Sequence, residues 1–333
     1  MTRNPLRTHL ITHSGTFHAD DVLAYTVLKD LFPEAKLVRT RDEKVLQAGK
    51  DSNTVGNKNC IIFDVGGEHN IHRDLFDHHQ ANAPMRQDGT PFSSFGMIWN
   101  RYGSEWVHKK LNTDLAHNRK IVQNLNAGFV ANIDRQDSGH GAPTLPTDLS
   151  AMIARFNLPA IDKNGNPIKH EDKDIDQAFV RASTWAKPIL MQAAVEAQQE
   201  AVVETLLENT IQSRKNPKDP ILILDQNLPW ERSIFNVQGH EHIAFVLTPS
   251  REGDWGVQSI AESKGSFIPK HPFPKTWAGL RNEDLEKVSG MKGAVFCHKG
   301  LYFAVHNTQE GAKNMAKTAL GKGTKTRDTG FER

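Results

Sequence analysis

The stretch that decides the fold reads HLITHSGTFHADDVLAYTVL and spans residues 9–28. Its first part, residues 9–13, predicts a short β-strand, and a Ser-Gly-Thr loop follows it. Residues 22–28 form an apolar run that Asp20 and Asp21 precede, which is typical of a helix with carboxylates in its first turn. The stretch therefore predicts a strand, a loop with polar side chains, and a helix, in that order.

The same alternation continues through the first half of the chain. Residues 60–65 are short and continuously apolar, as in a strand that is buried on both faces of a parallel sheet. Alternating strands and helices predict an α/β domain with a mostly parallel sheet. Further strands are expected at 36–39 and 75–77, and helices at 93–111, 114–133 and 148–157.

A second, smaller α/β domain is expected after a helical connector. Residues 171–213 read as one long helix or as two, with Pro188 as the interruption. Later segments predict a hairpin at 294–305 and a closing helix near 308–320. Short strands are also expected at 221–224, 233–235, 243–247 and 255–260. The predicted organisation is a first domain at 1–170, a connector at 171–215, a second domain at 216–322 and a mobile basic tail at 323–333.

Composition excludes several classes of protein. The 333 residues are 38% hydrophobic and 24% charged, which fits a globular protein and not a disordered one. No run approaches the roughly 18 apolar residues of a membrane helix, and no secretory signal is expected. Only two cysteines are present, Cys60 and Cys297, far apart, so a disulfide framework and a zinc ribbon are excluded. We expect a cytoplasmic protein, and an organellar address stays open.

Histidine and charge are unevenly distributed. Seven of the 16 histidines lie in the first 80 residues. Net charge is +2 overall, but residues 260–333 carry 13 Lys and Arg against 7 Asp and Glu, a local excess of +6. A basic C-terminal region can hold a polyanionic substrate. An ordinary solvated surface explains the same charge.

Four polar clusters lie at predicted strand ends or on a predicted helix. In an open α/β sheet, ligands bind beyond the carboxyl ends of the strands, so these clusters are expected to meet. Asp20 and Asp21, taken alone, can equally cap the helix that follows them. The clusters are His13 to His18 and Asp20, then Asp64, then Asp77-His78-His79, then Asp134 to Asp137.

Mixed His and Asp sets without cysteine suit Mn²⁺, Mg²⁺ or Co²⁺ better than a thiolate zinc site. A carboxylate between two ions can bridge them. Ion pairs about 3.5–4 Å apart activate a water and clamp a phosphoryl group during in-line displacement. The clusters therefore predict a metal centre for phosphate chemistry.

These residues also resemble a known family. The chain is similar to the DHH phosphoesterase superfamily and, more closely, to the MYG1 family, also called UPF0160. The similarity runs in order through almost the whole chain. The matching stretches are residues 12–21, 38–42, 63–68, 76–80, 277–281, 288–290 and 308–312.

The resemblance implies a two-domain enzyme with an N-terminal metal-binding domain and a smaller C-terminal domain that closes over the cleft. It implies two divalent ions, Mn²⁺ first, with Asp64 bridging them. His79 would face the substrate phosphate, and Asp77 would orient a ligating histidine. The first ion would be held by His13, His18 and Asp64, and the second by Asp20, Asp64, His78 and Asp134.

The C-terminal half departs from the family pattern at one point. Relatives often carry Gly-Gly late in the hairpin, where a phosphate can approach the backbone, but this chain has Ala304 and Val305. Their side chains would obstruct that approach. The candidates for substrate contact are Arg281, Lys292, His298 and His306.

The implied activity is that of a 3′→5′ exoribonuclease that hydrolyses RNA or short oligonucleotides. Three alternatives stay open: a phosphoesterase for a small phosphate compound such as a cyclic dinucleotide, nanoRNA or pyrophosphate, a metal-dependent protein hydrolase, and an RNA-binding protein without turnover. The identity of the metal, the polarity of digestion and the oligomeric state, including a homodimer, stay open as well.

Overall fold

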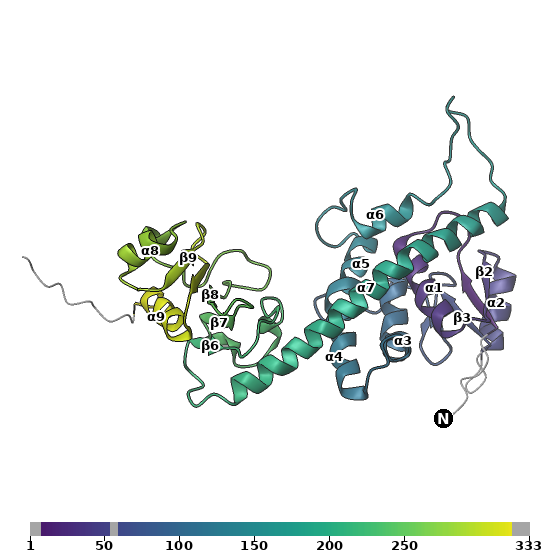
Figure 1. Cartoon of the computed structure of the whole chain (residues 1–333). Helices are drawn as coiled ribbons and strands as arrows, with labels where there is room; N and C mark the ends of the chain where they lie inside the picture. Colours follow the sequence, from purple (N-terminus) through teal and green to yellow (C-terminus); the bar gives the residue numbers. More distant parts are fainter. Residues whose placement is uncertain (1–7, 54–58, 322–333) are drawn as a thin grey trace, which may run out of the picture. The chain divides into compact units, whose positions relative to one another are not determined.

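The structure is a computed structural model that describes residues 8–53 and 59–321 (Figure 1). The chain divides into two compact units, Met1–Gln199 and Glu200–Arg333. The basic tail that was predicted at 323–333 lies outside the described residues. In the described part of the chain, no helix combines the length and the apolar character that crossing a membrane requires.

The N-terminal unit contains a five-stranded sheet in the order β2-β1-β3-β5-β4. Strands β1 (His9–Thr12), β2 (Lys36–Arg39), β3 (Cys60–Phe63) and β5 (Leu75–Phe76) are parallel, and β4 (His69–Asn70) is an antiparallel edge strand. The predicted mostly parallel α/β sheet is confirmed. Because the strands are parallel, the residues that follow β1, β3 and β5 meet at one edge of the sheet.

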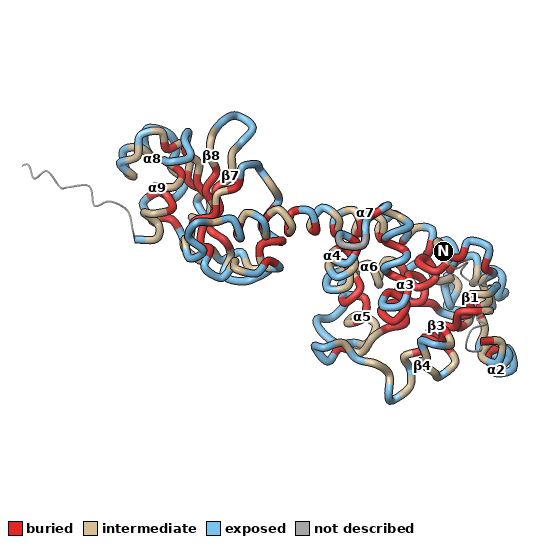
Figure 2. The backbone as a smooth tube through the Cα atoms, turned by 90° about the horizontal axis from the view of Figure 1, so that it is seen from below, coloured by how far each residue is buried: buried red, intermediate tan, exposed pale blue. Residues whose placement is uncertain are grey.

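Helix α1 (Ala19–Leu31) connects β1 to β2, and its first ten residues are all buried. It packs against α3 (Ser94–Leu111), which is labelled beside buried segments of the chain in Figure 2. The predicted helix at 114–133 is divided by a π-helical turn. The remaining helices before the long one are α2 (Glu43–Ser52), α4 (Leu115–Leu125), η1 (Asn126–Val130), α5 (Ala131–Asp137) and α6 (Leu149–Ala154).

A single helix, α7 (Asp172–Gln212), covers the predicted connector. Pro188 lies inside it without ending it. A proline removes the hydrogen bond to the carbonyl four residues earlier, here that of Thr184. Both residues are exposed, so water can reach that carbonyl, which explains why the helix continues.

The C-terminal unit contains a mixed five-stranded sheet in the order β6-β7-β8-β10-β9. Strand β6 (Ile221–Ile223) runs parallel to β7 (Phe245–Pro249), and the other neighbours are antiparallel. The predicted hairpin is confirmed as β9 (Ala294–Cys297) and β10 (Phe303–His306). The central strand is β8 (Trp255–Ser259).

The strand predicted at 233–235 is wrong. This segment begins a 3₁₀ helix, η2 (Ile234–Asn236), and Ile234 packs into a hydrophobic cluster with Leu207 of α7. Burial of one apolar side chain does not require extended backbone, which is why a three-residue apolar run cannot distinguish the two structures. Two more 3₁₀ turns are η3 (His240–His242) and η4 (Lys275–Trp277).

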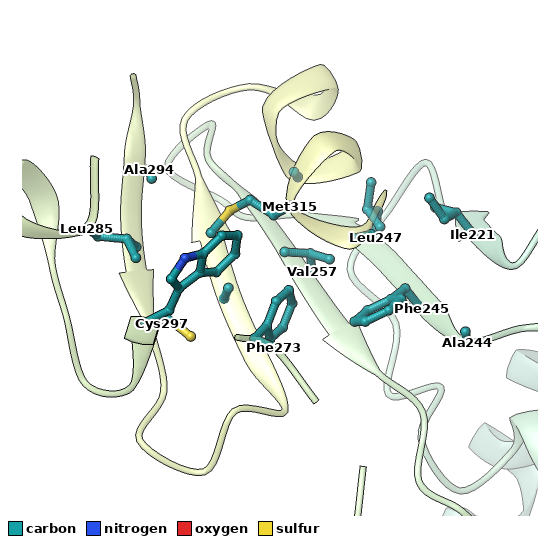
Figure 3. Packing of buried hydrophobic residues seen from close by; sticks show 14 residues of the cluster. Ile221, Ala244, Phe245, Leu247, Val257, Phe273, Leu285, Ala294, Cys297 and Met315 are labelled. Carbon is teal, nitrogen blue, oxygen red and sulfur yellow. The ribbon is translucent and has the colours of Figure 1, made fainter. Parts of the chain in front are cut away.

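Helices α8 (Asn282–Ser289) and α9 (Gln309–Ala319) complete the C-terminal unit. Met315 of α9 packs in the cluster that contains Val257 and Phe273 (Figure 3). Trp277 stacks on Phe273 with ring centroids 5.9 Å apart and is 2% exposed. Trp277 is therefore a packing residue of this core.

Candidate metal centre

His13 directly follows β1 and is a buried member of the cluster of histidines and aspartates at the edge of the sheet. Its Nδ1 donates to the Ser14 carbonyl oxygen at 3.1 Å. This bond leaves Nε2 facing Asp64 Oδ2 at 3.1 Å and Asp21 Oδ2 at 3.2 Å. Burial opposes protonation of the ring, but the hydrogen bonds and charges of Asp21 and Asp64 outweigh it and raise the pKa of His13 to about 10. The nearby carboxylates thus create a strong demand for positive charge at Nε2.

Asp64 lies at the centre of the cluster, directly after β3. Its backbone is in the left-handed region, with φ 55°, which is uncommon for a residue other than glycine and is concentrated at functional sites. One carboxylate oxygen lies 3.1 Å from His13 Nε2, and the other lies 2.9 Å from His78 Nε2. Burial would raise the pKa of Asp64, but the two imidazoles outweigh it and lower that pKa well below its usual range. The two oxygens of the Asp64 carboxylate therefore face two different histidines, His13 and His78.

Asp20 lies in the first turn of α1 and is 1% exposed. Its Oδ2 accepts a hydrogen bond from the Ser94 backbone N–H at 3.3 Å. Its Oδ1 is buried and has no hydrogen-bond partner among the residues that the structure describes. Burial, and then the charges of Asp64 and Asp137, raise the pKa of Asp20. A buried carboxylate in this state fits a cation ligand, since burial of an uncompensated charge is costly.

Asp137, and not Asp134, joins the cluster. Asp137 Oδ2 lies 3.6 Å from His78 Nε2, and the carboxylate lies within ligand reach of His18 and Asp20. Both oxygens of Asp134 are used elsewhere. Oδ1 accepts from the hydroxyl of Ser93 at 2.5 Å, and Oδ2 accepts from Nε of Arg86 at 2.5 Å.

This position differs from the ligand set that the resemblance implied. Asp134 lies three residues before Asp137 on α5, close to one helical turn away, so both can face the same side of the helix. Asp134 is fully buried, and its two carboxylate oxygens already accept hydrogen bonds from Ser93 and Arg86. We therefore place Asp137 in the candidate site.

Asp77 organises the loop that carries the two adjacent histidines. Its carboxylate accepts from the backbone N–H groups of Gly67 at 2.5 Å and His78 at 2.8 Å. Its Oδ1 also lies 2.7 Å from His79 Nδ1. The histidine ring that Asp77 contacts is thus that of His79. The His79 side chain is 63% exposed, and its Nδ1 is 3.9 Å from Asp64 Oδ1.

The structure brings six of the predicted residues together: His13, His18, Asp20, Asp64, His78 and His79. Together with Asp21 and Asp137, their ligand atoms form four groups, and within each group all atoms lie within 4.8 Å of one another. Imidazole and carboxylate donors without thiolate fit a divalent ion such as Mn²⁺ or Mg²⁺. The groups are His13, His18 and Asp64; Asp64, His78 and His79; His18, Asp20 and Asp137; and Asp20, Asp21 and Asp64.

The candidates for substrate contact in the C-terminal unit lie in different surroundings. His306 is 4% exposed, and its Nδ1 accepts from the Thr308 backbone N–H while Nε2 donates to the Lys292 carbonyl. Both ring nitrogens are therefore used within the unit. The guanidinium of Arg281 lies over the Phe296 ring at 4.3 Å, and the His298 ring lies 4.6 Å from that of Tyr302.

Three residues were not assigned to the site from the sequence: Asp137, which was noted only as part of a cluster, Asp21, which was noted as a possible helix cap, and Arg41. Asp21 also accepts from the His18 backbone N–H at 3.0 Å, which caps α1. Arg41 follows β2 and lines a cavity of about 320 Å³ together with Asp64 and His79. The available signal for Arg41 was its place after a parallel strand, because every such strand end points to the same edge of the sheet.

Comparison with known proteins identifies the family. A family model described as an uncharacterised protein family (UPF0160), with the short name MYG1_exonuc, matches residues 9–320. The chain belongs to this MYG1 family. A human protein named MYG1 exonuclease is 31% identical across 93% of this chain and 85% of its own length. The MYG1 protein of Dictyostelium discoideum is 28% identical across 95% of this chain and 98% of its own length.

One solved structure is also similar to this MYG1-family chain. The crystal structure of RecJ in complex with Mn²⁺ from Thermus thermophilus matches with 12% sequence identity and a TM-score of 0.27. The match covers 94% of this chain and 52% of the RecJ chain, so this chain spans about half of that protein. At this TM-score the likeness carries no argument about the metal centre of the MYG1-family chain.

Proposed function

We propose that this MYG1-family chain is a metal-dependent phosphodiesterase that shortens RNA or short oligonucleotides from the 3′ end with two divalent ions. The observation that carries the proposal is the position of Asp64 between His13 Nε2 and His78 Nε2. One carboxylate in this position can be shared by two ions. The name MYG1 exonuclease of the human relative supports the choice of a nucleic-acid substrate.

The residues present fit two ions. His13, His18 and Asp64 would hold the first, and Asp20, Asp64, His78 and Asp137 would hold the second. When bound, such a pair of ions activates a water and neutralises charge on the phosphoryl group. The buried Asp20 Oδ1 without a hydrogen-bond partner in the described part of the chain supports this assignment. Mn²⁺ is the ion that we propose first.

The protein's own groups would position these ligands and the phosphate. The Ser14 carbonyl accepts from Nδ1 of His13 and so directs its Nε2 lone pair toward Asp64. Asp77 holds His79 by Nδ1, which leaves Nε2 of that exposed ring for a phosphate oxygen. Its hydrogen bond to Asp77 raises the pKa of His79, which favours the ring as a hydrogen-bond donor.

A product ladder tests this function. Purified chain is incubated with single-stranded RNA that is labelled at its 5′ end, with Mn²⁺, Mg²⁺ or Co²⁺ supplied in turn. Digestion from the 3′ end shortens the labelled chain step by step, whereas digestion from the 5′ end releases a labelled mononucleotide first. RNA that stays intact with every metal contradicts the nuclease.

A small phosphate compound is the second candidate. The cavity of about 320 Å³ beside His79 lies at the lower end of the range for small-molecule pockets, about 300–1,000 Å³. Cleavage that falls off steeply with RNA length, together with fast turnover of a dinucleotide or of pyrophosphate, would favour it. Elemental analysis of the purified protein identifies the metal in either case.

A further inference from the structure

Arg41 stands beside the metal centre without a role in holding it. It follows β2, and its side chain lines the same cavity as Asp64, Asp77 and His79. Of the described residues that line this cavity, Arg41 is the only lysine or arginine. Three carboxylates also line it, those of Glu43, Asp64 and Asp77. An anionic group entering here would meet one permanent positive charge from the protein.

Among the described residues, the side chain of Arg41 makes one hydrogen bond, through its Nε. Its Nε donates to the Ser14 carbonyl oxygen at 3.3 Å, the same oxygen that accepts from His13 Nδ1. A guanidinium has five N–H donors in a planar fork, so this bond occupies one of them. Among the described residues, no carboxylate forms an ion pair with Arg41, and its side chain is exposed. Its two terminal nitrogens therefore remain for a ligand.

The neighbouring arginine shows the contrast. Arg39 is buried, donates to the Gly15 carbonyl at 2.8 Å and pairs with Asp176 at 3.3 Å. Its guanidinium also lies 4.6 Å from the centroid of the Phe179 ring. Arg39 is thus held by packing and by an ion pair inside the protein, whereas Arg41, two residues later, is exposed and lines the cavity.

We propose that Arg41 binds a phosphate group of the substrate on the His79 side of the metal centre. The proposal rests on the proposed function for the identity of the substrate. A guanidinium fork matches two phosphate oxygens at once, which a lysine cannot do. The Ser14 carbonyl holds that fork at a defined position relative to His13. Arg41 thereby selects substrates with a phosphate next to the one that is cleaved.

Kinetics with three variants test the proposal. Arg41→Gln keeps a donor for the Ser14 carbonyl but removes the charge, and Arg41→Lys keeps the charge but removes the fork. Arg119→Ala, on the exposed surface of α4, is the matched control for loss of one arginine. With single-stranded RNA and Mn²⁺, we expect Arg41→Gln to raise KM about 10- to 100-fold, the size of a charge-assisted contact. Arg41→Lys should lie between, and the control should match the wild type.

The salt dependence gives a second readout. Loss of one phosphate contact to a single strand lowers the slope of log KM against log salt by about 0.7. A change in KM with kcat nearly constant indicates a binding contact, because the interaction is equal in the ground and transition states. If Arg41 only positions the loop of Ser14, Arg41→Gln, which keeps a donor for that carbonyl, leaves KM and its salt slope at the wild-type values, and the proposal is overturned.

A binding measurement separates this proposal from the proposed function. Inorganic phosphate is titrated into the Mn²⁺-loaded wild type and into Mn²⁺-loaded Arg41→Gln, with calorimetric detection. Weaker binding of phosphate by the variant supports the role of Arg41 even if the wild type leaves RNA intact. Equal binding by both proteins overturns it, whatever the outcome with RNA.

Discussion

Two regions of the molecule contain buried histidines, and the ring nitrogens of these histidines have different kinds of partner in the two regions. At the end of β10, both ring nitrogens of His306 contact backbone groups of the same unit. At the carboxyl edge of the N-terminal sheet, Nε2 of His13 and of His78 instead face carboxylates that crowd one another. Hydrogen bonds to backbone groups leave no net charge to compensate. Carboxylates that lie close together repel one another and are stabilised by a bound cation. Burial alone therefore does not distinguish a structural histidine from a ligand.

The largest effect is expected from Asp64→Asn. Removing one stabilising donor from an active site typically costs about 100- to 1,000-fold in rate, and Asp64 would serve both ions. We expect a loss beyond about a thousandfold in the cleavage of labelled RNA, together with less bound Mn²⁺ by elemental analysis. Far-ultraviolet circular dichroism serves as the folding control. Full activity with normal metal content would remove Asp64 from the centre.

Asp134 and Asp137 provide a matched pair of variants that tests whether a buried carboxylate stabilises the fold or binds a metal. Asp134→Asn leaves Arg86 buried without its anion, so we expect a loss of about 3 kcal/mol in the free energy of unfolding with metal content retained. Asp137→Asn should lower metal content and activity with a smaller change in stability. Urea unfolding and elemental analysis of both variants decide between them. The reverse pattern would restore Asp134 as the ligand.

Gly311→Ala tests the packing around His306, the histidine whose ring nitrogens have partners within the C-terminal unit. A Cβ at Gly311 would overlap the ring of His306, so packing is destabilised even though alanine favours a helix. We expect a net loss of about 1–3 kcal/mol in the free energy of unfolding. In a His306→Ala background the ring is gone, so the additional cost of Gly311→Ala should vanish. A cost that persists there would mean that the glycine is required by its backbone and not by the histidine.

The smallest effect concerns Asp30, a carboxylate that the protein itself neutralises. Burial would raise its pKa, but Lys110, Lys187 and Trp106 outweigh it and lower the pKa. A lowered pKa means that this stabilisation is present above the unfolded value of about 3.9 and is lost as pH falls through the folded pKa. Asp30→Asn should cost about 1 kcal/mol near neutral pH.

Urea unfolding at several pH values measures this cost. The difference between wild type and Asp30→Asn should stay constant above about pH 5 and shrink below about pH 4. Asp30→Asn should leave metal content unchanged, because this carboxylate already has cationic partners. A difference that grows on acidification would contradict the assignment.

The part of the candidate site that is local in sequence could be predicted. His13, His18 and Asp20 follow one strand within eight residues, and the strand–loop–helix pattern places them at one sheet edge. The mostly parallel sheet followed from the same periodicity. The choice between Asp134 and Asp137 could not be made, because it depends on Ser93 and Arg86, which are more than 40 residues away. Pairing at that separation leaves no periodic signal.

The C-terminal candidates show the same limit. His306 was one of the candidates for substrate contact in the C-terminal half. Its ring nitrogens contact the Lys292 carbonyl and the backbone N–H and hydroxyl of Thr308, and the two backbone groups are common to almost every residue. Side-chain identity therefore could not reveal that the ring was already satisfied. The 3₁₀ turn at 234–236 was missed for a related reason, since its burial comes from residues of α7.

The left-handed backbone of Asp64 narrows the mutations that evolution can accept at this position. At φ 55° asparagine, aspartate and glycine are tolerated, whereas longer side chains are disfavoured. Asp64→Glu would keep the negative charge but fit this conformation poorly, and Asp64→Asn or Asp64→Gly would suit the conformation but lose the charge. Aspartate alone combines the negative charge with tolerance of this backbone conformation. We therefore expect every single substitution of Asp64 to reduce function.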